Sequence, residues 1–167
     1  MYHVHFNIGS NLGDREENIR RAVASLRQLA CISVSVRVSE PVVSPPWGFE
    51  SPNDFINVGM SLDTDLPPET LLEATQRIEQ SISTASHRDA TGAYIDRPID
   101  IDIIACATTG NDGTLHNLIE TSTEKLTLPH PRALQRDFVM QPLRAIDARL
   151  YNLLTQHHDA HAITEKL

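Results

Sequence analysis

Two aspartates, Asp100 and Asp102, stand two residues apart in the run RPIDIDIIA at residues 97–105. They alternate with isoleucines, a pattern that is typical of a β-strand. Successive side chains on a strand point to opposite faces, so the isoleucines share one face and the two carboxylates share the other. A rise of about 3.3 Å per residue puts the aspartate Cα atoms roughly 6–7 Å apart. Two carboxylates this close repel each other unless a cation or water separates them.

Phosphoryl chemistry would give this aspartate pair a use. Mg²⁺ takes one or two protein carboxylates and fills its other positions with water and phosphate oxygens. Two such ions suit a displacement at phosphorus, and the arginine just upstream, Arg97, suits a phosphate. The alternative is the solvated outer face of an ordinary strand. Aspartate is depleted in strands, however, and that favours a functional reason.

A second group of candidates lies in TLPHPRALQRDF, at residues 127–138. Prolines flank His130 and hold it rigidly, and Arg132 and Arg136 follow it. A histidine in this position could donate a hydrogen bond to a phosphate, or it could be structural. Farther upstream, Gln76 and Glu79 share one stripe of an expected helix, where a solvated helix edge is the simpler interpretation.

Residues that suit a flat ligand surround a proline-rich loop, PVVSPPWGFESPND, at residues 41–54. Phe55 and Asn57 follow this loop, so an aromatic ring and an amide could stack on and hydrogen-bond a heterocycle. They could equally be edge residues, and Trp47 could be a packing anchor of the loop. Long loops in compact domains are often functional.

Two further motifs have simpler interpretations. The turn GSNLGD at residues 9–14 could offer backbone N–H groups to an anion, but it lacks the pattern of a P-loop. A plain turn is the favoured interpretation. His157, His158 and His161 have the loose spacing of metal ligands, but they lie in a polar tail, which favours a solvated segment.

The periodicity predicts elements that would position these residues. Alternation predicts strands at residues 2–8, 31–40, 55–65 and 98–105, the second carrying Ile32, Val34, Val36 and Val38 on one face. Helical stripes predict a helix over residues 15–29, capped by Asp14, and a second one after Pro67 and Pro68. The stretch 83–97 is a long loop. Residues 126–146 follow as a short strand, a proline turn and one or two helical turns.

This order, β-α-β-β-α-β, predicts an α+β, ferredoxin-like fold. Both helices cover one face of an antiparallel sheet, and the other face is free to carry a site. The length of 167 residues suits a single domain, residues 1–167, with a core at about 1–146 and a C-terminal tail at 147–167 that is a small helix or frayed.

The composition narrows the class of protein. A net charge of −8 argues against nucleic acid and anionic membranes as partners, and no run of apolar residues is long enough to span a membrane. The N-terminus lacks a signal peptide, so the cytoplasm is the expected location. The two cysteines, Cys31 and Cys106, are expected to be buried free thiols.

Together these motifs resemble the 6-hydroxymethyl-7,8-dihydropterin pyrophosphokinase family of folate biosynthesis. The resemblance covers roughly residues 3–146, and the matching pieces stand in family order. They are IGSNLGD, SPPWG, DFINVG, TQRIEQ, RPIDIDII and LPHPRALQRDFVMQPL. Members of this family transfer pyrophosphate from ATP to the hydroxymethyl group of a reduced pterin and release AMP. The resemblance therefore implies a magnesium-dependent enzyme with two small-molecule substrates, ATP and the pterin. The size of the chain suggests a free-standing enzyme, and a monomer is expected.

The resemblance also implies roles for individual residues. Asp100 and Asp102 would hold two Mg²⁺ ions, and Arg97, His130 and Arg136 would contact the reacting phosphates. The pterin pocket would consist of Ser44, Pro45, Trp47, Phe55, Asn57 and Phe138. The ATP site would consist of Gln76, Glu79, Ile103 and Thr127, together with His130 and Arg136.

The loop at residues 83–97 departs from the family pattern. The family's Gly-Arg pair is missing, and its Arg-Trp-Gly-Pro-Arg run reads AYIDR, with Tyr94 in place of the tryptophan. Asp96 adds a negative charge beside Arg97, and His87 and Arg88 are candidates to supply the lost positive charge. Because this loop is the lid of the site, it bears on turnover.

Three functions remain open from the sequence. The leading one is an active pyrophosphokinase. The second is a catalytically weak or inactive paralogue that binds pterin and nucleotide, which the altered lid would favour and the intact aspartate pair opposes. The third is a Mg²⁺-dependent phosphohydrolase or transferase with another substrate.

Overall fold

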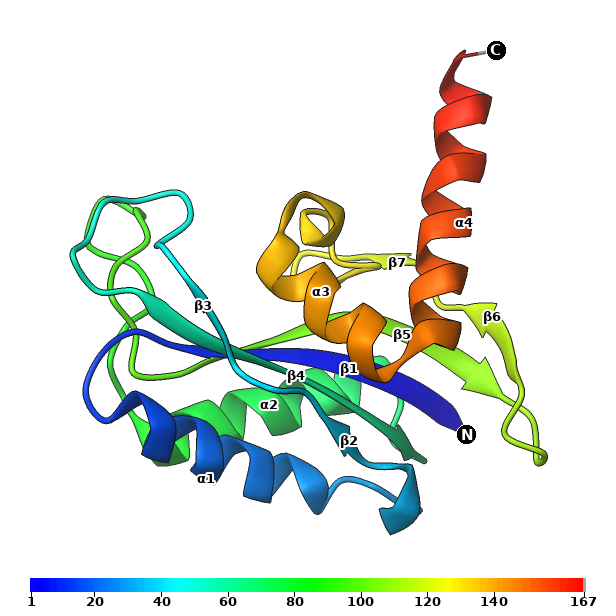
Figure 1. Cartoon of the computed structure of the whole chain (residues 1–167), viewed down its shortest axis with the longest axis horizontal. Coiled ribbons are helices and arrows are strands. Elements are labelled where there is room, and N and C mark those ends of the chain that lie inside the picture. Colours follow the sequence, from blue (N-terminus) through cyan, green and yellow to red (C-terminus); the bar gives the residue numbers. More distant parts are fainter. Residues whose placement is uncertain (167) are drawn as a thin grey trace.

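A six-stranded antiparallel sheet forms the centre of the protein, in the order β2-β4-β1-β5-β6, with β3 also paired to β4 (Figure 1). The computed structural model describes residues 1–166. The strands are β1 (Tyr2–Ser10), β2 (Arg37–Val38), β3 (Val42–Ser44), β4 (Phe55–Thr64), β5 (Asp100–Thr109) and β6 (Leu115–Leu118). A separate pair consists of β7 (Thr121–Ser122) and β8 (Thr127–Leu128).

Two helices, α1 (Arg15–Arg27) and α2 (Pro68–Ile82), cover one face of this sheet (Figure 1). The carboxylate of Asp14 accepts a hydrogen bond from the Glu17 amide and caps α1 as expected. Alternate residues of the central strands point into the core beneath the helices, as the sequence predicts. These are Val4, Phe6 and Ile8 of β1, Val58, Met60 and Leu62 of β4, and Ile101 and Ile103 of β5, with Ile99 just before it.

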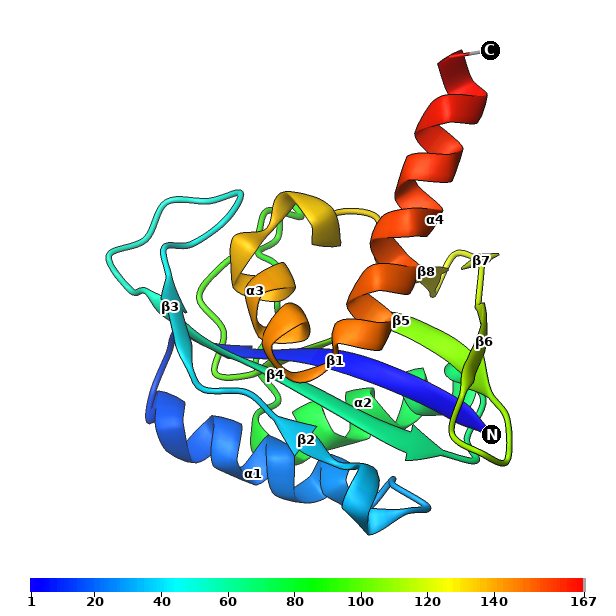
Figure 2. The same cartoon turned by 45° about the vertical axis from the view of Figure 1, so that its right-hand side comes forward.

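The opposite face of the sheet is half covered, which corrects the expectation that it is free. Helices α3 (Asp137–Ile146) and α4 (Ala148–Lys166), which follow a 3₁₀ turn, η2 (Ala133–Gln135), lie over it (Figure 2). A second core forms there from Ile104, Ala105, Ala107, Ala133, Val139, Leu143, Leu150 and Leu154. The part of this face that α3 does not cover stays open.

A glycine lets α3 approach the sheet closely. A Cβ added at Gly59 of β4 would lie 2.8 Å from Cβ of Pro142 in α3 and 2.9 Å from the ring of His5. Real side chains do not tolerate contacts this short. The glycine is thus required by packing between β4 and α3.

A bulge in β5 separates two halves of the strand. Phe6 of β1 pairs with Ile103 and His5 pairs with Ala105, so Ile104 is the extra residue. Up to Ile103 the isoleucines face α1 and α2, as the sequence predicts. After the bulge, both Ile104 and Ala105 belong to the core beneath α3 and α4.

A buried ion-pair network fastens the junction between α3 and α4 to the sheet. The ring of His3 contacts Oδ1 of Asp63 through Nδ1 and Oδ2 of Asp147 through Nε2, both at 2.6 Å. Asp147 is the single residue between α3 and α4, and its carboxylate also accepts a hydrogen bond from the Leu150 amide. We call His3, Asp63 and Asp147 the histidine cluster.

The predicted strand at residues 31–40 is largely wrong. Residues Ser33–Ser35 form a 3₁₀ turn, η1, and only the two residues of β2 pair, with Met60 and Ser61 of β4. This segment lies at the sheet edge, so the side chain of Val34 is 86% exposed. Cys31 is exposed rather than buried, whereas Cys106 is buried as expected.

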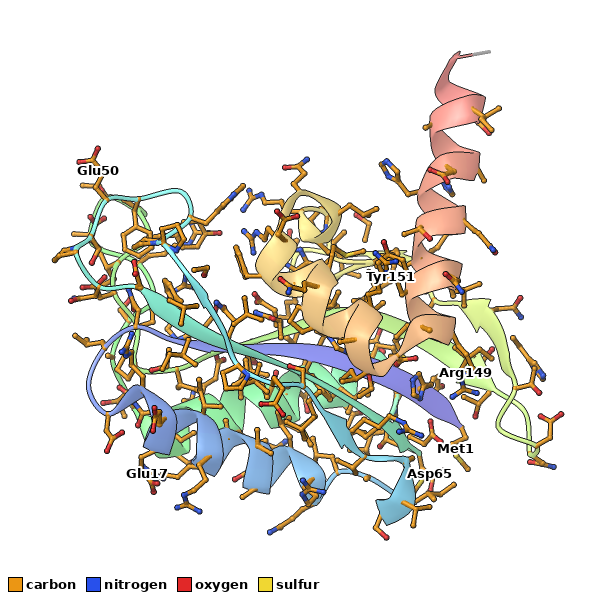
Figure 3. The ribbon with its side chains drawn as sticks, in the orientation of Figure 1. Met1, Glu17, Glu50, Asp65, Arg149 and Tyr151 are labelled. Carbon is orange, nitrogen blue, oxygen red and sulfur yellow. The ribbon has the colours of Figure 1, made fainter. Side chains whose placement is uncertain are left out.

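The C-terminal tail is a helix along the described part of its length, and residue 167 lies outside the described residues. Figure 3 shows Tyr151 of α4 pointing toward α3, where the guanidinium of Arg144 lies 5.8 Å from its ring centre. Within residues 1–166, the helices are too short or too polar to cross a membrane.

Candidate active site

A cavity of about 490 Å³ opens at the end of the sheet face that α3 leaves uncovered. Most of the residues expected from the sequence line it. They are Ser44, Pro45, Trp47, Phe55, Asn57, Gln76, Arg97, Asp100, Asp102, His130, Arg136 and Phe138. The strands β3, β4 and β5, the lid and the start of α3 therefore bring these residues around one space.

Three expected residues do not line this cavity. Ile103 is buried in the core beneath α1 and α2, and Thr127 is exposed on β8. Glu79 of α2 lies beside the cavity, where its Oε2 accepts a hydrogen bond of 3.0 Å from the Ile101 amide. The expected ATP contacts of these three residues stay predictions.

The two aspartates lie on the open face of β5, as their alternation with isoleucine indicates. Arg97 donates a hydrogen bond of 2.9 Å to Oδ2 of Asp100. Burial, and next the charge of Asp100, raise the pKa of Asp102 to about 7, although Arg136 and Arg97 act in the opposite direction. Burial and mutual repulsion thus both disfavour a second negative charge in this pair, and a cation would stabilise it.

An orphaned amide oxygen adds to the donor set around Asp102. Asn7 of β1 pairs with Asp102 across the sheet, and its Oδ1 is buried without a hydrogen-bond partner among the described residues. Carboxylate and amide oxygens are ligands of the kind that Mg²⁺ prefers. The residues present thus fit a magnesium ion held chiefly by Asp100 and Asp102.

A third carboxylate and a lid histidine stand behind this pair. Burial, followed by the charge of Asp100, raises the pKa of Glu79 to about 8. Nδ1 of His87 lies 3.5 Å from Oδ1 of Asp100, and its Nε2 lies 3.8 Å from Oε2 of Glu79. Glu79, Asp100 and Asp102 form what we call the carboxylate cluster, and His87 of the lid reaches it.

Basic side chains surround the rest of the cavity, in keeping with an anionic ligand. They are Arg88, Arg97, Lys125, Arg132 and Arg136. Burial, and then the charges of Arg136 and Arg132, lower the pKa of His130 to about 4, so its ring is neutral at pH 7. Nδ1 of His130 accepts a hydrogen bond from the Arg132 amide, which leaves the proton on Nε2 as a donor.

Aromatic rings and an amide line the part of the cavity next to β3. The side-chain nitrogen of Asn57 donates to Oγ of Ser44 at 2.8 Å and to the Val42 carbonyl at 3.2 Å. The guanidinium of Arg136 lies 4.3 Å from the Trp47 ring centre. Flat faces and fixed hydrogen-bonding groups of this kind suit a planar heterocycle.

The lid is an ordered hairpin in which Arg88 and Tyr94 pair. Asp89 closes the turn, with its Oδ1 accepting hydrogen bonds from the Thr91 and Ala93 amides. Arg88 stacks on Tyr94 at 4.1 Å from the ring centre, and the Tyr94 hydroxyl accepts a hydrogen bond from Nη1 of Arg132. The lid thereby brings Arg88 to the cavity, and its role as a substitute for the missing arginines stays a prediction.

Asp96 holds the end of the lid, a role that sequence reasoning missed. Its carboxylate accepts hydrogen bonds from the side chains of Asn11, at 2.7 Å, and Asn53, at 2.6 Å. Oδ1 of Asn11 in turn accepts a hydrogen bond from the Arg97 amide. The GSNLGD turn is thus a structural anchor that fixes the backbone of Arg97.

Comparison with known proteins agrees with this geometry. A family model described as 7,8-dihydro-6-hydroxymethylpterin-pyrophosphokinase matches residues 5–148. Curated relatives named 2-amino-4-hydroxy-6-hydroxymethyldihydropteridine pyrophosphokinase include one from Porphyromonas gingivalis, 37% identical over 84% of this chain and 87% of the relative. Another, from Bacillus subtilis, is 37% identical over 83% of this chain and 74% of the relative.

A plant relative is longer. The mitochondrial folate synthesis bifunctional protein of Pisum sativum is 32% identical over 81% of this chain, which corresponds to 23% of that protein. The family model and the bacterial relatives both match most of this chain. The chain therefore belongs to the 7,8-dihydro-6-hydroxymethylpterin-pyrophosphokinase family.

Proposed function

We propose that this protein transfers the terminal diphosphate of ATP to the hydroxymethyl group of 6-hydroxymethyl-7,8-dihydropterin and releases AMP, a step in folate biosynthesis. The observation that carries this proposal is the cavity itself. It combines a pair of carboxylates, a ring of basic side chains and an aromatic pocket within one space. Membership of the family identifies which phosphate donor and which heterocycle fit these parts.

In this reaction the pterin hydroxyl oxygen forms a bond to the β-phosphorus of ATP. The bond between that phosphorus and the oxygen bridging to the α-phosphate breaks, and the hydroxyl proton is lost to solvent or to the leaving group. Asp100 and Asp102 would hold magnesium, which would supply positive charge to the phosphate oxygens. We assign two ions to the site, which Asp100 and Asp102 would hold.

The protein's own part is positioning and charge. Trp47, Phe55 and Phe138 hold the pterin ring, and Asn57 and Ser44 orient it through hydrogen bonds. Arg97, Arg136 and the Nε2 proton of His130 meet the negative charge that moves onto the phosphates. Gln76 and Glu79, with Ile103 and Thr127, complete the proposed nucleotide site. Holding the hydroxyl in line with the β-phosphorus accounts for much of the rate gain.

We assign the arrangement of β1, α1, β2, β4, α2 and β5 to the ferredoxin-like class. The order of these strands in the sheet supports this assignment. The family match over residues 5–148 supports a single pyrophosphokinase domain with a core ending near residue 146. We also propose that the protein acts as a monomer and that it works in the cytoplasm, where its co-substrate ATP is available.

The test is AMP production from ATP, Mg²⁺ and 6-hydroxymethyl-7,8-dihydropterin by the full chain, with Asp102→Ala as the control. We expect AMP that depends on the pterin and is lost in the variant. AMP production that proceeds without pterin, or that survives both Phe55→Ala and Asn57→Ala, would refute the pterin assignment. No AMP, together with tight pterin binding, would instead identify an inactive paralogue.

A further inference from the structure

We propose that Glu120, His157 and His161 form a binding site for a divalent transition-metal ion of the zinc type, remote from the active site and independent of the proposed function. His157 and His161 stand four residues apart on α4, so they share one face of the helix. Glu120 lies in the connection between β6 and β7. We call these three residues the α4 site.

The side chains of the α4 site already converge. Nε2 of His157 and Nε2 of His161 both approach Oε1 of Glu120, the latter at 3.4 Å. One ligand atom from each residue lies within 4.8 Å of the other two. Two ligands about 2.1 Å from one tetrahedral zinc ion lie roughly 3.4 Å apart, which matches the separation of His161 Nε2 from Glu120 Oε1.

The hydrogen bond on the far side of His161 selects the form of the ring that binds metal. Its Nδ1 lies 2.9 Å from the His157 carbonyl oxygen, which can only accept, so Nδ1 carries the proton. In the neutral ring, Nε2 then presents a lone pair to the Glu120 carboxylate, which also presents lone pairs. A cation between them resolves this repulsion. Metal-binding histidines commonly donate their other N–H to a carbonyl in this way.

The place of the α4 site on the helix gives such an ion a structural task. The last core residue of α4 is Leu154, and the buried residues of the described chain end there. Figures 1 and 2 both show the remainder of α4 projecting beyond the sheet. His157 is one turn past Leu154, so an ion would tie the projecting half of the helix to the β6–β7 connection.

The ligand set indicates the class of ion. Two imidazoles with one carboxylate suit zinc and its neighbours, whereas Mg²⁺ prefers oxygen ligands alone. Three protein ligands leave the fourth tetrahedral position to water. The side chains of Glu120 and His161 are 57% and 61% exposed, so an ion reaches them directly.

The test is Zn²⁺ binding by the metal-stripped full chain, measured by calorimetry in excess Mg²⁺ and by the absorption of bound Co²⁺. We expect wild type to bind one zinc ion that His157→Ala and His161→Ala weaken at least about 10- to 100-fold. His158→Ala is the matched control, because His158 lies beside the site on the same helix without belonging to it. It should bind zinc as wild type does.

Glu79, His87 and Asp100 near the active site form a second set of possible metal ligands. Zinc binding by that set must be distinguished from zinc binding at the α4 site. His87→Ala removes that set and should leave the α4 site intact. Zinc should also raise the unfolding temperature of wild type and His158→Ala, but not of His157→Ala. Equal zinc binding by wild type and His157→Ala, or loss of the strong site in His87→Ala alone, would overturn the proposal.

Discussion

Two charged clusters lie toward opposite ends of β1, and they differ in the partners of their carboxylates. In the histidine cluster, His3 lies between Asp63 and Asp147 with both ring nitrogens in contact with carboxylates. In the carboxylate cluster, burial and next the charge of Asp100 raise the pKa values of Asp102 and Glu79. Helix α3 lies over the face between them.

The difference separates stability from chemistry. A buried charge that contacts oppositely charged partners contributes to folding stability. Removing one partner leaves the remaining charge buried without an opposite charge beside it. A group of carboxylates whose pKa values are raised by burial and mutual repulsion is instead a place for a ligand. We therefore expect substitutions in the histidine cluster to weaken folding and those in the carboxylate cluster to abolish turnover.

The largest expected effect is that of Asp102→Asn on catalysis. AMP formation should fall by about 10³-fold, because several kcal/mol of charge stabilisation at the phosphates would be lost. The unfolding temperature should not fall, since one of two repelling carboxylates becomes neutral. The comparison would fail if this variant unfolded more readily than wild type and still made AMP.

His3→Gln should lower the stability of the protein and leave its activity unchanged. We expect the free energy of unfolding in urea to fall by about 3 kcal/mol, because Asp63 and Asp147 lose the cation between them. AMP formation per folded molecule should stay unchanged. Loss of activity with full stability would instead connect the histidine cluster to the active site.

The pH dependence of stability should sharpen the contrast. Burial alone would lower the pKa of His3, but Asp147 and Asp63 raise it above its ordinary value of 6.5. The stability that His3 contributes is then complete below that value and is lost as the pH rises through the folded-state pKa. The gap between wild type and His3→Gln should therefore shrink from about pH 6 to about pH 9. A gap that widens toward pH 9 would contradict this assignment.

Tyr94→Phe, a substitution in the lid beside the carboxylate cluster, should have the smallest effect on kcat. It removes the hydrogen bond from Arg132 and keeps the ring on which Arg88 stacks. A net hydrogen bond of about 1 kcal/mol corresponds to a fall in kcat of roughly fivefold. Tyr94→Leu removes the ring as well and should cost more. Equal rates for both variants would show that the ring contributes nothing.

The strand with the two aspartates could be predicted because its information is local. Alternation alone places Asp100 and Asp102 on one face, and the motifs of the family bring in the aromatic and basic residues around them. The same rule failed at residues 31–40, where alternation is equally strict. There the chain lies at a sheet edge with little to pair against, and Val34 faces solvent.

Contacts between distant residues could not be predicted. His3 meets partners 60 and 144 residues away, and neither carboxylate carries any local sign of the pairing. The same holds for Asp96 with Asn11, and for Glu120 with His157. The i, i+4 spacing of His157 and His161 is the one local signal for the α4 site, and it places the two rings on one face only if the tail is helical.

The bulge at Ile104 bears on which changes in chain length the protein tolerates during evolution. Deleting Ile104 would restore regular pairing and leave the aspartates, and the alanines beyond, on their present faces. Deleting one residue at Ile101 would instead turn one aspartate toward the helices, because a strand reverses its faces with every residue. A deletion at the bulge therefore costs the packing of one buried side chain but keeps both aspartates on their face, whereas a deletion three residues earlier breaks the site. We expect length variation among descendants of this strand to collect at the bulge.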